Sequence, residues 1–352
     1  MSRLGVVLPA LTLVLSGGLA CAAASEAPDA AARPTTAERR IDTLGPIDTV
    51  VAISIDGLNP NAITKLRKRG TPALHRLIRT GASTLNARTE LELTDTLPNH
   101  TGMVTGRRIE AATGGHGVTW NDDRRRPSTV QAAAGHEVES VFDVVHDAGG
   151  STAYFASKTK FSLWERSWDE AIDTDVIIEN NRRLTRRFVA DLAGTTRSFR
   201  LLHLSAPDAA GHDHGFMSPR YLETVTATDR LVGKVLRAIS SSPTLSGHTA
   251  VILTSDHGGR GASHRAPNRP ANYTVPFMVW GPDVAVADLY DINPTYTDPG
   301  RTQSTYDDAT IRNGDVANLA LDLLELPAVT DSEHNVAQDL VTLTTDPNPA
   351  AG

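Results

Sequence analysis

Residues Val251 to Gly259 read V-I-L-T-S-D-H-G-G and are the most informative segment of the chain. The apolar run from Ala250 to Leu253, which overlaps the start of this segment, has the length and composition of a buried parallel strand. An acid, an imidazole and two glycines follow at once. Open α/β sheets place ligand sites at the carboxyl ends of their strands, so Asp256 and His257 are the first candidates for a metal centre. A plain capping turn is the alternative interpretation of this pair.

Strand and helix patterns alternate through most of the chain. Runs typical of buried strands are Thr49–Ile55, Thr152–Ala156 and Phe199–Ser205, and runs typical of helices include Asn61–Arg69, Arg182–Leu192 and Arg220–Ser240. Such alternation favours a largely parallel sheet that helices cover on both faces. We therefore predict an α/β fold, a three-layer αβα sandwich with a largely parallel central sheet.

Composition limits the classes of partner. The chain has 352 residues and a formal net charge of -7, with a pI near 5.9. This length can bury a large core, and we expect one large catalytic domain. Because nothing in the overall charge favours polyanions, we expect no docked nucleic acid, although a small phosphate ester could bind in a local pocket.

The first 24 residues resemble an export signal. Arg3 precedes an apolar stretch from Leu4 to Leu15, and an alanine-rich end follows at Ala20 to Ala24. The apolar stretch is too short for a membrane span, so we expect a secreted or extracytoplasmic protein. Cys21 is the only cysteine and lies where a lipoprotein signal places its modified cysteine. A lipid anchor at Cys21 is the alternative to free secretion, and it is the one membrane contact that we expect.

The remaining boundaries follow from composition. Residues 25–46 are rich in Ala, Pro, Thr and charge, without periodicity, and are predicted to be a flexible leader. The catalytic domain is predicted to cover residues 47–328, and residues 329–352 to form a C-terminal tail.

Three further fragments carry polar side chains after strand or helix signals. Asp56-Gly57 ends the first strand, and Asp56 either binds a ligand or caps the next helix. Thr96 lies where Pro98 indicates the first turn of a helix, either as an N-cap or as a residue that meets an oxyanion. Asp208 and His212 are four residues apart, so one helical turn would direct both at a single ion.

Taken in order, these fragments resemble the alkaline phosphatase superfamily, and most closely its nucleotide pyrophosphatase/phosphodiesterase branch. The branch typically has a strand that ends in D-G, a T-x-P-N-H nucleophile turn, H-G-x-x-x-N, P-D-x-x-G-H and S-D-H-G. This chain has all five, at Asp56, Thr96 to His100, His116 to Asn121, Pro207 to His212 and Ser255 to Gly258. The likeness covers roughly Val50 to Pro327 and implies an alkaline phosphatase-like fold.

The resemblance implies two Zn²⁺ ions per chain. Asp56, Asp256 and His257 would hold one ion, which the Thr96 oxygen reaches. Asp208, His212 and a later histidine would hold the other. His264 is assigned as that histidine because it precedes the segment Val275 to Pro282, as the last ligand of the family does; His334 is the other histidine after His257.

The resemblance also implies the reaction, because two zinc ions can stabilise both oxygens of an in-line displacement at phosphorus. Thr96 would attack phosphorus and form a phosphothreonine, which is then hydrolysed. Asn121 matches an asparagine that binds a phosphate oxygen, and a neutral amide favours phosphodiester or pyrophosphate substrates. Lys158 and Lys160 resemble the paired lysines of phosphonoacetate hydrolases, and solvated lysines are the alternative interpretation.

The expected function is therefore that of a two-zinc phosphohydrolase acting on a small phosphate ester, such as a nucleotide or another phosphodiester. A phosphonoacetate hydrolase-like C-P bond hydrolase or a phosphomonoesterase of the same superfamily is the alternative among enzymes. A sulfatase is disfavoured because neither cysteine nor serine stands at the nucleophile turn. Outside enzymes, the alternative is a metal-holding binding protein without catalysis. The sequence leaves the natural substrate and the oligomeric state open.

Overall fold

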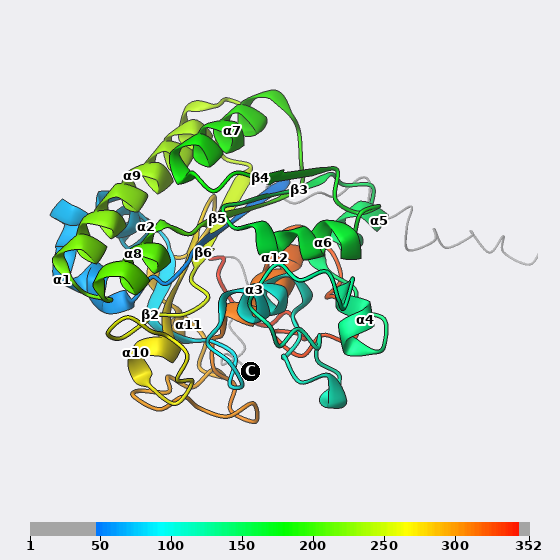
Figure 1. Cartoon of the computed structure of the whole chain (residues 1–352). Coiled ribbons are helices and arrows are strands. Elements are labelled where there is room, and N and C mark those ends of the chain that lie inside the picture. The colour runs from blue at the N-terminus through cyan, green and yellow to red at the C-terminus, as the bar shows by residue number, and fades with distance from the viewer. Residues whose placement is uncertain (1–46, 345–352) are drawn as a thin grey trace, which may run out of the picture.

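The computed structural model describes residues 47–344, and its centre is one eight-stranded sheet (Figure 1). The strand order is β4-β3-β5-β1-β6-β7-β2-β8. The strands are β1 (Thr49–Ile55), β2 (Ala82–Arg88), β3 (Thr152–Ala156), β4 (Thr174–Ile177), β5 (Phe199–Leu204), β6 (Thr249–Thr254), β7 (Thr274–Trp280) and β8 (Ala287–Asp288). The predicted α/β class is confirmed, with helices on both faces of the sheet.

Most strands of the sheet are parallel. β1 pairs in parallel with β5 on one side and β6 on the other, so that Ile53 lies opposite both Leu202 and Leu253. β3 pairs in parallel with β5 and β4. β7 is antiparallel to both of its neighbours, β6 and β2. The alternation of strand and helix patterns in the sequence carried no sign of this antiparallel direction.

The central strands are apolar on both sides, and alternate residues enter two separate cores. In β1, Val51 and Ile53 enter one core, whereas Val50 and Ala52 enter the other. The first core packs beneath α1 (Pro60–Gly70), α2 (Pro72–Thr80), α7 (Asn181–Gly194) and α9 (Pro219–Ser241). This burial on both faces explains the unbroken apolar runs that indicated parallel strands.

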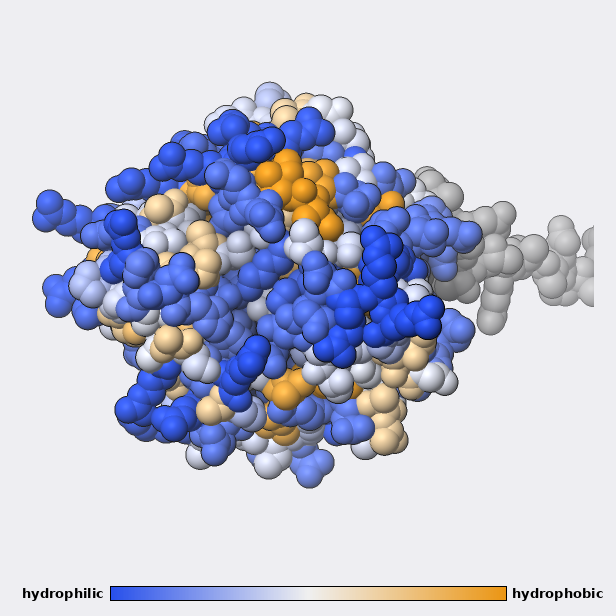
Figure 2. Space-filling model, in the orientation of Figure 1, coloured by the Kyte–Doolittle hydropathy of each residue, from blue (hydrophilic) through white to orange (hydrophobic). Residues whose placement is uncertain are grey.

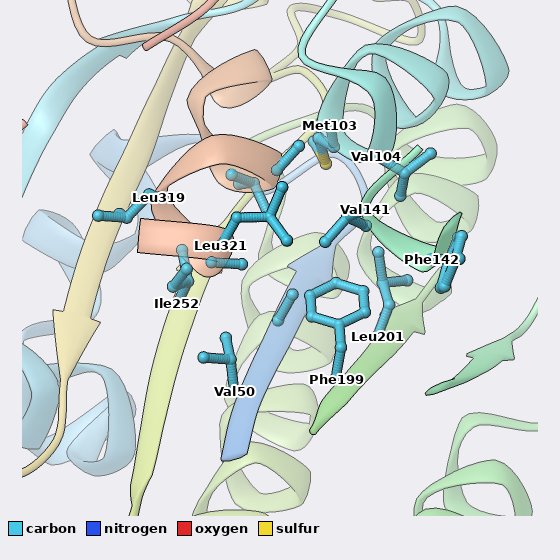
Figure 3. Packing of buried hydrophobic residues seen from close by; sticks show 14 of the residues in the cluster. Val50, Met103, Val104, Val141, Phe142, Phe199, Leu201, Ile252, Leu319 and Leu321 are labelled. Atoms are coloured by element: carbon cyan, nitrogen blue, oxygen red, sulfur yellow. The ribbon is translucent and has the colours of Figure 1, made fainter. Parts of the chain in front are cut away.

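The second core lies on the opposite face of the sheet, beneath α3 (Thr96–Thr105), α5 (Val141–Asp147), α6 (Ser162–Ser167) and α12 (Val316–Leu323). Figure 3 shows Phe199 and Leu201 of β5 among Val141, Phe142 and the α12 leucines. The two cores hold the helices on opposite sides of the sheet, as Figure 1 shows. The three-layer αβα arrangement follows from this partition.

Shorter helices connect these layers. They are α4 (Val130–Ala134), α8 (Ala206–His214), α10 (Pro270–Tyr273) and α11 (Leu289–Ile292), with 3₁₀ turns at Ala111–Thr113, Thr159–Phe161 and Asn313–Asp315. α8 follows the carboxyl end of β5, and the Ser255–Gly258 loop follows the carboxyl end of β6. Because β5, β1 and β6 are adjacent and parallel, the residues after them meet at one edge of the sheet.

The described part of the predicted tail, residues 329–344, is folded onto the domain. Val329 and Leu340 are each 1% exposed, and the Asn318 side chain bonds the backbone of both Val329 and His334. These few apolar residues were too widely spaced to show a periodic pattern, so the sequence suggested a loose end. The predicted signal, leader and Cys21 lie outside the described residues. Within residues 47–344, no helix is long and apolar enough to cross a bilayer.

Candidate active site and metal centre

Thr96 is the first residue of α3 and is fully buried. Asp95 occupies the N-cap position, so the N-cap interpretation of Thr96 does not hold. Asn99 ties the turn together: its amide donates to the backbone oxygens of Leu93 and Asp95, and its Oδ1 accepts from the Glu90 N–H. The Thr96 residue is thereby held at the amino terminus of a helix, where the helix dipole favours negative charge.

Asp56, Asp256 and His257 meet at the carboxyl ends of β1 and β6. His257 Nε2 lies 3.2 Å from Asp256 Oδ2 and 3.5 Å from Asp56 Oδ1, and all three side chains are fully buried. Asp256 Oδ1 accepts the backbone N–H groups of Gly57 and His257, each at 3.0 Å. These two bonds hold Asp256 so that Oδ2 faces the other two groups.

Asp208, His212 and His264 form a second group beside the first. His212 Nε2 lies 3.3 Å from Asp208 Oδ1 and 3.1 Å from His264 Nε2. The His257 and His264 rings are stacked with centroids 3.6 Å apart, which joins the two groups. Two sets of potential ligand atoms therefore lie together, one from Asp208, His212 and His264 and one from Asp56, Asp208 and His257.

The three histidines of this cluster share a hydrogen-bond pattern. Nδ1 of His212 contacts the Ala262 carbonyl, Nδ1 of His257 the Gly258 carbonyl and Nδ1 of His264 the Thr94 carbonyl. A carbonyl only accepts hydrogen bonds, so each Nδ1 carries the proton. In the neutral ring, Nε2 then offers a lone pair to the cluster, the arrangement that metal-ligating histidines adopt.

Buried atoms without partners indicate that the cluster is suited to cations. Among the described residues, no hydrogen-bond partner exists for Asp56 Oδ1, Asp208 Oδ1, Asp256 Oδ2 and His257 Nε2. Burial and the nearby charge of Asp56 raise the pKa of Asp256 to about 8. Because three buried carboxylates cannot all ionise without compensating charge, the donor set fits divalent cations.

Lys158 reaches into the same cluster from the loop after β3. Its ammonium lies 2.6 Å from Asp56 Oδ2, 2.8 Å from Asp208 Oδ2 and 3.2 Å from Thr96 Oγ1. Burial disfavours the charged form of Lys158, but the negative charges of Asp56 and Asp208 favour it. The net result is a raised pKa of Lys158. The solvated-lysine interpretation is therefore wrong for Lys158.

Asn121 lies beside the nucleophile in the loop after the H-G element. Its Oδ1 accepts the Leu97 N–H at 3.0 Å and the Lys160 ammonium at 2.8 Å. Lys160 also donates to the Asn121 backbone oxygen at 2.7 Å. Since Oδ1 is occupied by two donors, Nδ2 is the part of the Asn121 amide that remains as a hydrogen-bond donor.

His203, on β5, is a site residue that the sequence interpretation missed. Its Nδ1 accepts the Ser157 N–H, so Nε2 carries the proton and donates to Asp56 Oδ2 at 2.9 Å. This is the opposite tautomer from the three cluster histidines, and it makes His203 a support for a carboxylate. A polar residue one position before the end of a buried strand was the available signal.

Gly57 explains the D-G pair after β1. Its φ is +70°, a backbone conformation that favours glycine, and a Cβ there would lie 3.0 Å from the Asp208 Cα. The close approach of this loop to α8 brings Asp56 and Asp208 into the same space.

His334 lies away from the cluster. Its Nε2 contacts both carboxylate oxygens of the fully buried Glu90 at 3.0 Å, on the other side of the nucleophile turn. Of the two histidines considered for the last ligand position, the structure places His264 with Asp208 and His212.

The chain is similar in sequence to known proteins. Residues 50–346 match the sequence profile of the family described as type I phosphodiesterase / nucleotide pyrophosphatase. A GPI ethanolamine phosphate transferase 1 of Neurospora crassa is 31% identical over 106 residues, which are 30% of this chain and 10% of that protein. The chain thus spans about a tenth of the length of the curated relatives that it matches.

Two solved structures illustrate the likeness of fold. Inactive murine ectonucleotide pyrophosphatase/phosphodiesterase 5 in complex with AMP is 15% identical, with a TM-score of 0.61 over 84% of this chain and 100% of the other. The periplasmic domain of a phosphoethanolamine transferase from Campylobacter jejuni is 12% identical, with a TM-score of 0.57 over 88% of this chain and 98% of the other.

The Glu90–His334 pair predicts a pH dependence of stability. Burial disfavours the charged form of both side chains, but the opposite charge of the partner and the hydrogen bond between them act against burial. The net result is that the pKa of Glu90 is lowered and the pKa of His334 is raised from 6.5. The contribution of His334 to the free energy of unfolding is therefore fully present below pH 6.5. It is lost as the pH rises through the raised pKa of His334. In urea unfolding, the wild-type free energy of unfolding should fall over that range relative to His334→Gln.

The exposed His146 supplies the control, since His146→Gln should keep the wild-type pH profile. Breaking the buried pair should also cost about 3–5 kcal/mol at pH 6. Identical pH profiles for wild type and His334→Gln would contradict the charged pair.

Proposed function

The chain belongs to the type I phosphodiesterase / nucleotide pyrophosphatase family, and we propose that it is a metal-dependent hydrolase of phosphodiester or pyrophosphate bonds in small phosphate esters. The observation that carries the proposal is the position of Thr96. Its hydroxyl lies at a helix amino terminus, beside two groups of carboxylate and imidazole atoms, several of which have no hydrogen-bond partner among the described residues. Phosphoryl transfer needs this combination of a nucleophile and concentrated positive charge.

Two metal ions are part of the proposal. Asp56, Asp256 and His257 would hold one, and Asp208, His212 and His264 the other. Mixed carboxylate and neutral imidazole donors, with three protein ligands per ion, suit Zn²⁺. Bound ions would stabilise negative charge on the reacting oxygens and would lower the pKa of a hydroxyl that reaches them.

Thr96 would supply the nucleophile in a two-step reaction. Its Oγ forms a bond to phosphorus while the bond from phosphorus to the leaving oxygen breaks, which gives a phosphothreonine. Water then attacks phosphorus, and the Thr96 oxygen leaves and regains its proton. The amino terminus of α3 favours the phosphoryl oxygens in both steps. His100 supports the turn by donating from Nδ1 to the Thr96 carbonyl at 2.8 Å.

Asn121 supports a preference for diesters. Its Nδ2 group is the neutral donor beside Thr96, and a neutral donor suits the single negative charge of a phosphodiester. Lys158 supports the alternative, because a cation 3.2 Å from Thr96 Oγ1 also favours a doubly charged monoester or phosphonate. A phosphonoacetate hydrolase-like enzyme or a phosphomonoesterase is therefore the second candidate.

A transferase is the other alternative within phosphoryl transfer. The curated relative from Neurospora crassa is named as an ethanolamine phosphate transferase, and an acceptor alcohol in place of water would give the same first step. A binding protein without catalysis is less well supported, since the chain carries Thr96 together with all six residues that are proposed as ligands. We also propose an extracytoplasmic location, on the strength of the predicted signal in residues 1–24.

A substrate panel should separate these candidates. Zinc-loaded protein should hydrolyse bis-p-nitrophenyl phosphate with a higher kcat/KM than p-nitrophenyl phosphate or phosphonoacetate, because Asn121 supplies a neutral donor. Glycerol should be present as an acceptor, with products followed by phosphorus NMR. Faster turnover of phosphonoacetate would overturn the diester preference, and glycerol phosphate as the main product would identify a transferase.

Thr96→Ala should reduce kcat by roughly 10³-fold or more while metal content stays at the wild-type level, because it removes the nucleophile and none of the proposed six ligands. Thr96→Ser keeps a hydroxyl and should retain measurable activity. Turnover and metal content are measured on the same samples. Wild-type kcat in Thr96→Ala would exclude Thr96 as the nucleophile.

Metal analysis should assign the last ligand. His264→Ala should lower the zinc content or affinity of one site, since it removes an imidazole from Asp208 and His212. His334→Ala should keep both metal equivalents, because His334 pairs with Glu90; the exposed His146→Ala is the matched control. Loss of zinc in His334→Ala with retention in His264→Ala would reverse the assignment.

A further inference from the structure

The charge of the molecule is concentrated on one helical layer. The helices α1, α2, α7 and α9 together contain fourteen Lys and Arg residues but three Asp and Glu residues, a formal balance of +11 in a chain with a net charge of -7. These helices cover the same face of the sheet, and α9 packs against the other three. We call their outer surface the basic face.

Apart from the half-buried Arg76, the basic residues of this face are solvent-exposed. The arginines of α7 are spaced so that Leu184 and Phe188 enter the core while all four guanidinium groups face outward; they are Arg182, Arg183, Arg186 and Arg187. Figure 2 shows strongly hydrophilic side chains along the margin where α1, α7 and α9 lie. Among the described residues, Arg220 with Glu223 is the one ion pair that a basic residue of these helices makes.

The acids of the four helices do little to offset this charge. Asp191 is turned toward Arg197 and Arg200, outside the layer, with contacts of 2.8–3.2 Å. Asp229 is fully buried and accepts the N–H groups of Ala73 and Leu74 at the start of α2. The exposed charges of the layer are therefore almost all basic.

A cavity lies within the basic face, between α2 and α9. Its volume is about 220 Å³, and three arginines line it together with Asp229. Arg76 is partly fixed there, because it stacks over the Trp280 ring at 4.8 Å and donates to Ser240. Arg230 and Arg237 are exposed on α9. Three guanidinium groups around a cavity of this size suit a phosphate group.

We propose that the basic face docks on a bilayer of anionic phospholipid, with a headgroup phosphate in the cavity between α2 and α9. Basic charge spread over four helices matches a partner whose negative charge is also spread over a surface, and each Lys or Arg near an anionic bilayer adds about fivefold to affinity. This binding route is separate from the lipid anchor considered for Cys21.

Single-stranded nucleic acid fits this face less well. Proteins that bind single strands combine basic grooves with exposed aromatic rings on which bases stack. The aromatic residues of the four helices are Phe188 and Tyr221, and both are fully buried. The basic face thus offers charge without a stacking surface.

Vesicle binding of the full chain tests the proposal. Wild type should bind vesicles of equal parts phosphatidylcholine and phosphatidylglycerol much more tightly than vesicles of phosphatidylcholine alone, and high salt should weaken this binding. An acyl or apolar anchor inserts into both kinds of vesicle, so the difference between them reports the basic face. Equal binding to both would overturn the proposal.

Variants locate the surface. Changing all four α7 arginines to Gln should lower affinity for the anionic vesicles by roughly two to three orders of magnitude. A control with the same charge change, Arg125→Gln, Arg126→Gln, Arg269→Gln and Arg301→Gln, lies outside the basic face and should bind nearly as wild type. If both variants lost the same affinity for the anionic vesicles, the effect would come from net charge alone. That result would refute a localised binding surface.

A competition experiment distinguishes the lipid headgroup from free phosphate and from nucleic acid as the ligand of the basic face. Arg230→Gln with Arg237→Gln should lower vesicle binding, and inorganic phosphate at the lipid-phosphate concentration should leave wild-type binding unchanged. Displacement by inorganic phosphate, or tighter binding of single-stranded DNA than of the anionic vesicles, would overturn the lipid assignment. Activity on a soluble diester should match wild type in all these variants. Vesicle binding therefore tests the basic face, whereas wild-type activity tests the proposed function, and either can fail without the other.

Discussion

Mutual repulsion among three buried carboxylates is the constraint on which the site depends. Asp56 and Asp256 come from two loops and Asp208 from the first turn of α8, and all three share one space with little access to water. Burial of several like charges is unfavourable unless cations compensate them. Lys158 supplies one positive charge, and the raised pKa of Asp256 indicates that the cluster accommodates more. The surrounding structure, from the D-G turn to the histidine tautomers, holds these groups together against that repulsion.

Much of this arrangement could be predicted from the sequence. The strands around Ala52, Leu202 and Ile252 are apolar on both faces, so their pattern indicates burial, and the polar residues after them had to meet at one sheet edge. The motif at Thr96 to His100 pointed to the helix amino terminus that the structure shows. The order of Asp56, Asp208 and Asp256 along the chain corresponds to the strands β1, β5 and β6, which are neighbours.

Other features depend on contacts between distant segments, and local patterns carry little information about them. Lys158 resembles a solvated lysine until β3 is placed beside β5, which brings its ammonium to Asp56 and Asp208. The tautomer of His203 depends on Ser157 in a neighbouring loop. The overall charge of -7 conceals a basic face, because net charge contains no information about which helices share a side of the sheet. The segment 329–344 lacks periodicity, and its packing depends on single bonds such as those from Asn318.

The pairing of β1 has a consequence for the order in which the protein assembles. β1 begins at Thr49, but its two neighbours are β5 and β6, and the second of these ends at Thr254. During synthesis the centre of the sheet therefore waits for most of the chain to leave the ribosome. Non-local pairing of this kind slows folding, so the nascent chain has no native core until late in its synthesis.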